Sequence, residues 1–223
     1  MHRIFILSPA NSAGERARLL HNPRARFDLA RKLQRGEKVG LGEIFSFLSG
    51  LYFRGKFAYS LAFARPPESI SGAYVITSNC GLMPALQPIS LRQLQSFGTT
   101  EIDPREEDYA RPLQLHSKRL AKKIGPECEV VLLGSIGTKK YAEPLAVHFG
   151  QRLLFPGSFA GRGDMSRGGL LLRCVAENRE LDYLPVLGSN RHGKRPEKLT
   201  PKRWGYKINE GATTIETAKQ SNA

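Results

Sequence analysis

One segment of the chain gathers the residue types that bind small anions. Residues 157–169 contain five glycines, two arginines and two serines, directly ahead of a predicted helix. Free amides at a helix N-terminus and paired arginine donors both suit a phosphate or a carboxylate. We therefore predict an anion site made by Arg162, Gly163, Ser166 and Arg167. The alternative is a flexible loop in which Asp164 caps the helix and pairs with an arginine.

Polar and glycine residues also follow three short apolar runs. These runs span residues 3–7, 73–77 and 129–133, and each is typical of a buried strand. In an open parallel sheet the loops after such strands gather at the carboxyl edge, where ligands bind. The pattern predicts a crevice there, although tight turns alone would also use these residues. The predicted lining is Ser8, Ser78, Asn79, Gly81, Gly134 and Ser135.

Helical segments separate the apolar runs and would position these loops. A fourth strand is predicted at 152–155, and helices are predicted at 28–35, 43–48, 51–64, 109–124, 139–149 and 166–178. This alternation indicates an α/β fold, with a mostly parallel central sheet and flanking helices. We expect a single Rossmann-like domain over 1–187, with a helical, basic insertion at 11–70. A basic and largely disordered tail is expected at 188–223.

The charge of the chain favours a polyanionic partner. The 223 residues contain 34 Lys+Arg and 20 Asp+Glu, a formal charge of +14. The tail accounts for about +5 of this, which leaves about +9 in the body, concentrated before residue 60. Such an excess indicates contact with a nucleic acid or another polyanion.

A glycine turn in the basic part of the chain suggests how DNA would be held. Two predicted helices flank Gly40-Leu41-Gly42, as in a helix–hairpin–helix that offers backbone amides to a phosphate. The cationic side would come from four residues, and the alternative is an ordinary loop between helices. The predicted DNA contacts are Arg31, Lys32, Arg35, Lys38, Gly40 and Gly42.

Several other classes of site lack their motifs. Neither a dinucleotide-binding GxGxxG after the first strand nor a P-loop is present, and we predict no cofactor. Without HExxH or a Cys/His cluster, no metal site is predicted. Three widely spaced cysteines and the lack of a long apolar stretch point to a cytoplasmic protein without a membrane span.

Four segments, in order, resemble the YaaA family of peroxide-stress proteins. The opening Ile4–Ala10 resembles that family's "ILISPAK", and Ser78–Pro84 is similar to its second strand loop. Val130–Ser135 with Lys140-Tyr141 looks like "VVINLAS…EY", and Arg162–Arg167 followed by Ala176–Arg179 looks like "ARGLMSR…IENR". Asn11 stands where the family has Lys, and residues 11–70 match poorly.

The resemblance implies a cytoplasmic α/β protein that binds and protects DNA during peroxide stress. Our first hypothesis is therefore DNA binding, with RNA as another polymer, and a nucleotide or base in the crevice. The alternative is an enzyme that excises or exchanges a nucleobase, with Lys140, Tyr141 or Asp164 as catalytic residues. A third hypothesis is a small-molecule-binding domain with a basic tail. The sequence leaves the oligomeric state open.

Overall fold

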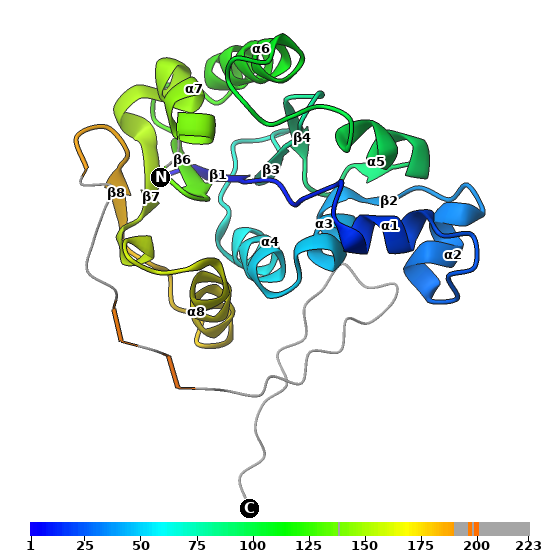
Figure 1. Ribbon diagram of the computed structural model, residues 1–223. Helices are drawn as coiled ribbons and strands as arrows, with labels where there is room; N and C mark the ends of the chain where they lie inside the picture. Colours follow the sequence, from blue (N-terminus) through cyan, green and yellow to red (C-terminus); the bar gives the residue numbers. More distant parts are fainter. Residues whose placement is uncertain (138, 190–195, 198, 201–223) are drawn as a thin grey trace, which may run out of the picture.

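A six-stranded, mostly parallel sheet forms the centre of the molecule (Figure 1). The computed structural model describes residues 1–137, 139–189, 196–197 and 199–200. The strand order is β4-β3-β1-β6-β7-β8; β3, β1, β6 and β7 are parallel, and the two edge strands are antiparallel. The bounds are β1 (Arg3–Leu7), β3 (Ala73–Ile76), β4 (Leu82–Pro84), β6 (Glu129–Leu133), β7 (Leu153–Pro156) and β8 (Tyr183–Pro185).

Helices cover both faces of this sheet, as the alternation in the sequence predicts. Four helices lie between β1 and β3: α1 (Glu15–His21), α2 (Asp28–Gln34), α3 (Leu41–Ser49) and α4 (Leu51–Phe63). The rest are α5 (Leu91–Phe97), α6 (Glu107–Lys123), α7 (Lys139–Phe149) and α8 (Asp164–Ala176). A separate ribbon pairs β2 (Val39–Gly40) with β5 (Pro88–Ile89). The prediction of an α/β fold with a mostly parallel sheet is confirmed.

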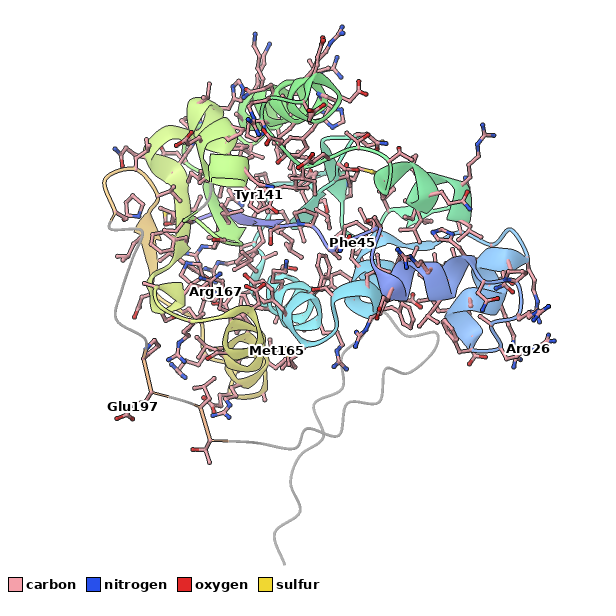
Figure 2. All side chains as sticks on the ribbon, viewed as in Figure 1. Arg26, Phe45, Tyr141, Met165, Arg167 and Glu197 are labelled. Carbon is pink, nitrogen blue, oxygen red and sulfur yellow. The ribbon has the colours of Figure 1, made fainter. Side chains whose placement is uncertain are left out.

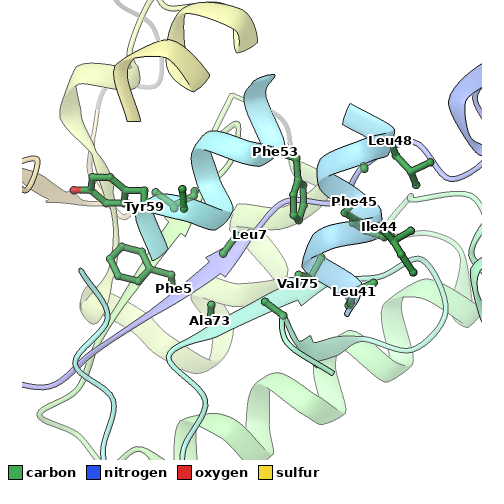
Figure 3. Packing of buried hydrophobic residues seen from close by; sticks show 14 of the residues in the cluster. Phe5, Leu7, Leu41, Ile44, Phe45, Leu48, Phe53, Tyr59, Ala73 and Val75 are labelled. Carbon is green, nitrogen blue, oxygen red and sulfur yellow. The ribbon is translucent and has the colours of Figure 1, made fainter. Parts of the chain in front are cut away.

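The two faces of β1 belong to two hydrophobic clusters. Phe5 and Leu7 pack with residues of α3, α4 and α8, and Figure 3 shows α3 and α4 lying over this face of the sheet. Ile4 and Ile6 pack with residues of α6 and α7 on the opposite face. This alternation with a period of two is what a strand covered on both faces requires.

The connections on either side of β1 create a switch point at the sheet edge. From β1 the chain goes to β3 on one side, and it later returns to β6 on the other side. Ligands of doubly wound sheets bind outside the carboxyl ends of the strands at such a point. The loops after β1 and β6 are therefore the first place to look for a functional site.

The predicted tail lies mostly outside the described residues, and several short elements of the fold were not predicted. Most of the segment 188–223 lies outside the described residues. The short elements α1, β2, β4, β5, α5 and β8 were not predicted. None of the helices in the described ranges has the length and the apolar character that a membrane span requires.

Candidate functional site

The ends of β1 and β6 lie close together at the switch point. The Ser8 amide donates a hydrogen bond to the Leu133 carbonyl oxygen over 3.1 Å. A Cβ atom at Gly134 would lie 2.8 Å from Ser8 Cβ, so a larger side chain at Gly134 would displace Ser8. Glycine is therefore needed at Gly134 for the close approach of these two strand ends.

A cavity of about 500 Å³ opens at this edge of the sheet. It lies between the segment that follows β1, the N-terminus of α7, and the end of α5 with the loop behind it. Its size falls within the range of small-molecule sites, roughly 300–1,000 Å³. The lining residues are Pro9–Ala13, Phe45, Ser78, Phe97–Ile102, Lys140 and Tyr141.

A lysine outside the residues predicted from the sequence is buried beside Ser8. Lys56 of α4 is 1% exposed, and its Nζ donates to the Ser8 carbonyl oxygen over 2.6 Å. The distance from Nζ to Ser8 Oγ is 2.9 Å. The rings of Tyr52 and Phe53 lie 4.5 and 4.6 Å from Nζ, measured to their centroids. Lys56 is thus enclosed by one serine and two aromatic faces.

This environment lowers the proton affinity of Lys56. Burial lowers its pKa to about 7, because the charged ammonium has lost its water; the Asp164 carboxylate opposes the shift and the Arg167 guanidinium adds to it. The Asp164 side chain is 69% exposed, so its charge compensates Lys56 only weakly. An amine with a pKa near 7 is present in substantial amounts as the neutral base at physiological pH.

Arg167 lies on α8, which packs against α4. Its Nε and Nη2 donate to the Phe159 carbonyl oxygen over 3.3 and 3.2 Å, and its guanidinium lies 5.4 Å from the Phe159 ring centroid. Arg167 also pairs with Asp164, with 3.6 Å between Nη1 and Oδ1. Figure 2 shows Arg167 on the side of the sheet that faces α8, with Tyr141 across the sheet edge from it.

The other predicted anion ligands are satisfied within their own loop. Arg162 donates from Nε to the Ser158 carbonyl oxygen and from Nη1 to Ser166 Oγ, over 3.0 and 3.1 Å. Gly163 is the N-cap residue of α8. The cap predicted as the alternative, Asp164, instead lies in the first turn, where it forms the ion pair with Arg167.

Tyr52 carries a buried hydroxyl that lacks an acceptor within the described ranges. Its hydroxyl is inaccessible to solvent and has no acceptor among the described residues, while the Arg167 guanidinium lies close enough to act on it as a hydrogen-bond donor. Burial raises the pKa of Tyr52 to about 12, although Arg167 nearby opposes the shift. The phenol therefore remains protonated at physiological pH and is a hydrogen-bond donor without an acceptor.

The polar residues after β3 hold the loop in place. Ser78 Oγ donates to the Phe97 carbonyl oxygen, and Asn79 Nδ2 donates to that of Ser96, both over 2.7 Å. Gly81 has a positive φ of 60°, and a Cβ atom there would lie 2.4 Å from the Pro112 carbonyl oxygen. Of these residues, only Ser78 lines the 500 Å³ cavity.

Ser135 lies in the loop after β6, where it follows Gly134 and is half-buried.

The three predicted catalytic residues have different surroundings. Lys140 and Tyr141 both line the cavity, and the Lys140 carbonyl oxygen accepts a hydrogen bond from the Tyr109 hydroxyl. Burial, with the Asp164 charge, raises the pKa of Tyr141. Asp164 itself is largely exposed at the start of α8 and does not line the cavity.

The prediction that the glycine turn offers free amides is wrong. Gly40 ends β2 and is the N-cap residue of α3, while Leu41 and Gly42 already belong to that helix. The amides of Leu41 and Gly42 donate to the carbonyl oxygens of Gln87 and Ala85 over 2.9 and 2.7 Å. A Cβ atom at Gly42 would lie 2.5 Å from the Phe57 ring, so this glycine serves packing.

The predicted cationic contacts are nevertheless accessible. Arg31, Arg35 and Lys38 are exposed, and Lys32 is half-buried. All four lie on α2 or in the turn after it, which are blue in Figure 1 and at the far end from α8. Within the described ranges, no group of three or more His, Cys, Asp or Glu side chains is placed to hold a metal ion.

Comparisons with known proteins give no family for the chain. No protein-family model matches it, and neither the curated proteins nor the solved structures contain a match. The resemblance to the YaaA family therefore stays a prediction.

Proposed function

We propose that the chain binds DNA through the surface of α1 and α2 and receives a nucleobase or nucleotide in the cavity. The observation that carries the proposal is the position of the cavity next to the basic surface. The segment Pro9–Ala13 lines the cavity and leads directly into α1, which begins at Glu15. A strand bound along α1 and α2 would thus have a single-nucleotide site at its side. The peroxide-stress role and a cytoplasmic location remain parts of this proposal.

The charge on this surface supports a grip on phosphates. Residues 15–38 contain eight Lys/Arg and three Asp/Glu. Of these cations, only Lys32 is half-buried, and the others are exposed. Arg26 projects from the outer edge of the molecule in Figure 2. Cations spread in this way contact the nucleic acid backbone, which contributes affinity without sequence specificity.

The cavity suits a flat polar ligand such as a base. Tyr141 provides a half-buried aromatic side chain, and the buried residues Phe45 and Phe97 border the cavity. Asn11 and Thr99 provide polar groups. Bases stack on aromatic rings and use amides and hydroxyls for hydrogen bonds at their edges. The location outside the strand ends is where doubly wound sheets hold nucleotides.

Charge reversal on two matched sets of four cations tests the DNA proposal. The test variant carries Arg31→Glu, Lys32→Glu, Arg35→Glu and Lys38→Glu. The control carries Lys118→Glu, Arg119→Glu, Lys122→Glu and Lys123→Glu, all exposed on α6 on the other face of the sheet. Both sets change the net charge equally, so they separate a specific surface from general attraction.

Fluorescence anisotropy with labelled single- and double-stranded DNA, and with RNA, would measure affinity between about 50 and 200 mM salt. We expect the α2 variant alone to lose affinity, with its slope of log K against log salt reduced by up to about 4. Equal losses in both variants, or none in either, would contradict the proposed surface. Circular dichroism would check that both variants are folded.

A second candidate function is excision or exchange of a base, because Lys140 and Tyr141 line the cavity. Tyr141→Phe should then abolish release of free base from DNA while affinity for DNA is unchanged. Chromatography of the released bases gives the readout. If the wild-type protein releases no base, or the variant loses only affinity, this candidate function is rejected.

A further inference from the structure

We propose that Ser8 and Lys56 form a nucleophile–base pair that cleaves a carboxylic ester or amide through an acyl-serine intermediate. This activity is independent of the DNA proposal. It requires only the pair itself, the cavity beside it and a donor for the developing negative charge. Each of these three components is present at the switch point of the sheet.

The distance between the two side chains meets the first requirement. Lys56 Nζ lies 2.9 Å from Ser8 Oγ, within the roughly 2.6–3.2 Å that a nucleophile and its base need. The second contact, 2.6 Å to the Ser8 carbonyl oxygen, fixes the direction of the amine. In the structure Nζ donates to both the Ser8 carbonyl oxygen and Ser8 Oγ. In the neutral amine, one N–H keeps the bond to the carbonyl oxygen and the lone pair becomes free to accept the Ser8 hydroxyl proton. Serine–lysine pairs of this type occur in acyl-transfer enzymes.

The surroundings of Lys56 keep a reactive fraction of the amine neutral. Burial lowers the pKa of Lys56 to about 7; the Asp164 carboxylate opposes this shift, and the Arg167 charge acts in the same direction as burial. The aromatic faces of Tyr52 and Phe53 exclude water from the amine. A general base whose pKa lies near the working pH is both available and strong enough to accept a proton.

Ser8 does not itself line the cavity, but it directly precedes the segment that does. It is the first residue after β1, and Pro9 to Ala13, which follow it, line the 500 Å³ cavity. The close contact with Gly134 fixes the end of β1 against β6. Ser8 is 6% exposed, so its hydroxyl is shielded from bulk water.

Tyr52 is the donor for the oxyanion. Its hydroxyl is buried and has no acceptor among the described residues, and its ring, like that of Phe53, lies over Lys56 Nζ. A phenol that remains protonated can donate a hydrogen bond to the oxygen that becomes negative during attack. Arg167, on the adjacent α8, adds a positive charge to the same region.

The proposed reaction has two stages, acylation of Ser8 and hydrolysis of the acyl-serine. Ser8 Oγ attacks the carbonyl carbon as its proton passes to Lys56 Nζ, which forms a tetrahedral oxyanion. The bond to the leaving alcohol or amine breaks, and the leaving group takes the proton from Lys56. Water then attacks the acyl-serine with Lys56 as base, which releases the carboxylic acid and restores the Ser8 hydroxyl.

The competing explanation is that Lys56 only ties α4 to the end of β1. The two roles differ in the reactivity of Ser8. A fluorophosphonate probe reacts with an activated serine and with water only slowly, and mass spectrometry locates the modified residue. On the full-length protein we expect one adduct, on Ser8, together with hydrolysis of p-nitrophenyl acetate.

The variants separate the roles of the two residues. Ser8→Ala should abolish labelling and hydrolysis, and Lys56→Arg should slow both at least about 100-fold, because arginine cannot act as the base. Ser158→Ala is the matched control, since Ser158 also follows a parallel strand but is exposed and lies outside the pair. This control should react at the wild-type rate.

The pH profile provides a readout that a purely structural lysine would not change. Labelling of the wild-type protein should rise about tenfold between pH 6 and pH 8, following the neutral fraction of Lys56, and then level off. This measurement needs only the wild-type protein, so it distinguishes a catalytic Lys56 from a purely structural one even if the variants fail to fold. An unmodified Ser8, or a rate that is independent of Lys56, would overturn the proposal.

Discussion

Gly55 and Gly168 touch at the point where α4 packs against α8. A Cβ atom at Gly55 would lie 2.6 Å from the Gly168 carbonyl oxygen. A Cβ atom at Gly168 would lie 2.7 Å from both the Leu51 carbonyl oxygen and Tyr52 Cα. The two helices therefore approach closely because neither residue has a side chain. Their neighbours in sequence, Lys56 and Arg167, are brought into the same region by this contact.

Replacing Gly168 should consequently destabilise the protein. The methyl group of Gly168→Ala meets backbone atoms, which cannot rotate away, so we expect a loss of about 1–3 kcal/mol in the free energy of unfolding. Urea unfolding measures this loss. Gly169→Ala is the control, because its nearest neighbour would be a side-chain atom of Leu199 at 3.9 Å. If alanine leaves the free energy of unfolding unchanged at Gly168 as well as at Gly169, α4 and α8 can move apart without destabilising the protein.

The strands and helices of this fold were largely predictable because their local patterns are strong. Val130–Leu133 of β6 and the aromatic stretch of α4 are examples, and both are found where they were predicted. The edge strands β4 and β8 are only three residues long, too short for a pattern with a period of two to stand out. The prediction for the Gly40–Gly42 turn was wrong because Gly42 is needed for packing under the Phe57 ring, and a glycine needed for packing looks the same in the sequence as one in a phosphate-binding turn.

The site was predictable only in part. The strand ends identified Ser8, but nothing local connects it to Lys56, which is 48 residues away. A signal was present in the helix itself. Lys56 lies four residues after Tyr52 and three before Tyr59, so it falls on the buried aromatic stripe of α4. A charged residue on such a stripe needs a buried partner, and only the fold shows which one.

The low pKa of Lys56 predicts how stability depends on pH. The folded protein releases this proton at about pH 7, whereas the unfolded chain holds it until its ordinary pKa of 10.5. Between these values the unfolded state binds more protons, so the free energy of unfolding rises with pH. Lys56→Met removes this contribution.

The wild-type protein should therefore gain about 2 kcal/mol relative to Lys56→Met between pH 7 and pH 9, a conversion based on about 1.4 kcal/mol for each pKa unit. Urea unfolding of both proteins at pH 7, 8 and 9 provides the comparison. Parallel pH profiles would show that Lys56 is charged in the folded protein throughout this range.

The aromatic pair on the basic surface predicts a contribution from base stacking. Phe27 is 37% exposed and stacks on Phe47, with 5.1 Å between ring centroids and 21° between planes. Arg24 and Arg26 precede Phe27, so a strand held there would pass over the ring. Under the DNA proposal, Phe27→Ala should weaken binding of single-stranded DNA by about 1–3 kcal/mol.

Leu19→Ala provides the control, because Leu19 is a 48% exposed apolar residue on α1 of the same surface but has no ring to stack. Anisotropy titrations at one fixed salt concentration compare the two variants. If the loss is the same for both, the effect comes from apolar contact area rather than from stacking.

The ion pairs around Glu180 predict how the fold responds to acid. Arg3 pairs with both Glu129 and Glu180, and Arg65 Nη2 lies 3.0 Å from Glu180 Oε2. Burial opposes ionisation of Glu180, but the hydrogen bonds from Arg3, Tyr183 and Arg65 outweigh it and hold the pKa of Glu180 below its usual value. The carboxylate therefore stabilises the fold above the ordinary pKa of glutamate, and this contribution is lost as the pH falls through the lower folded pKa.

Glu180→Gln should cost about 1 kcal/mol of unfolding free energy at pH 7, since it keeps the shape but removes the charge from partly exposed pairs. The difference between wild type and variant should shrink from pH 5 to pH 3, as the wild-type carboxylate becomes protonated. Urea unfolding at pH 7, 5 and 3 measures it, with Glu68→Gln as an exposed control outside these ion pairs. A difference that stays constant down to pH 3 would mean that the charge of Glu180 contributes nothing, and that only the shape of the glutamate matters to β1 and its neighbours.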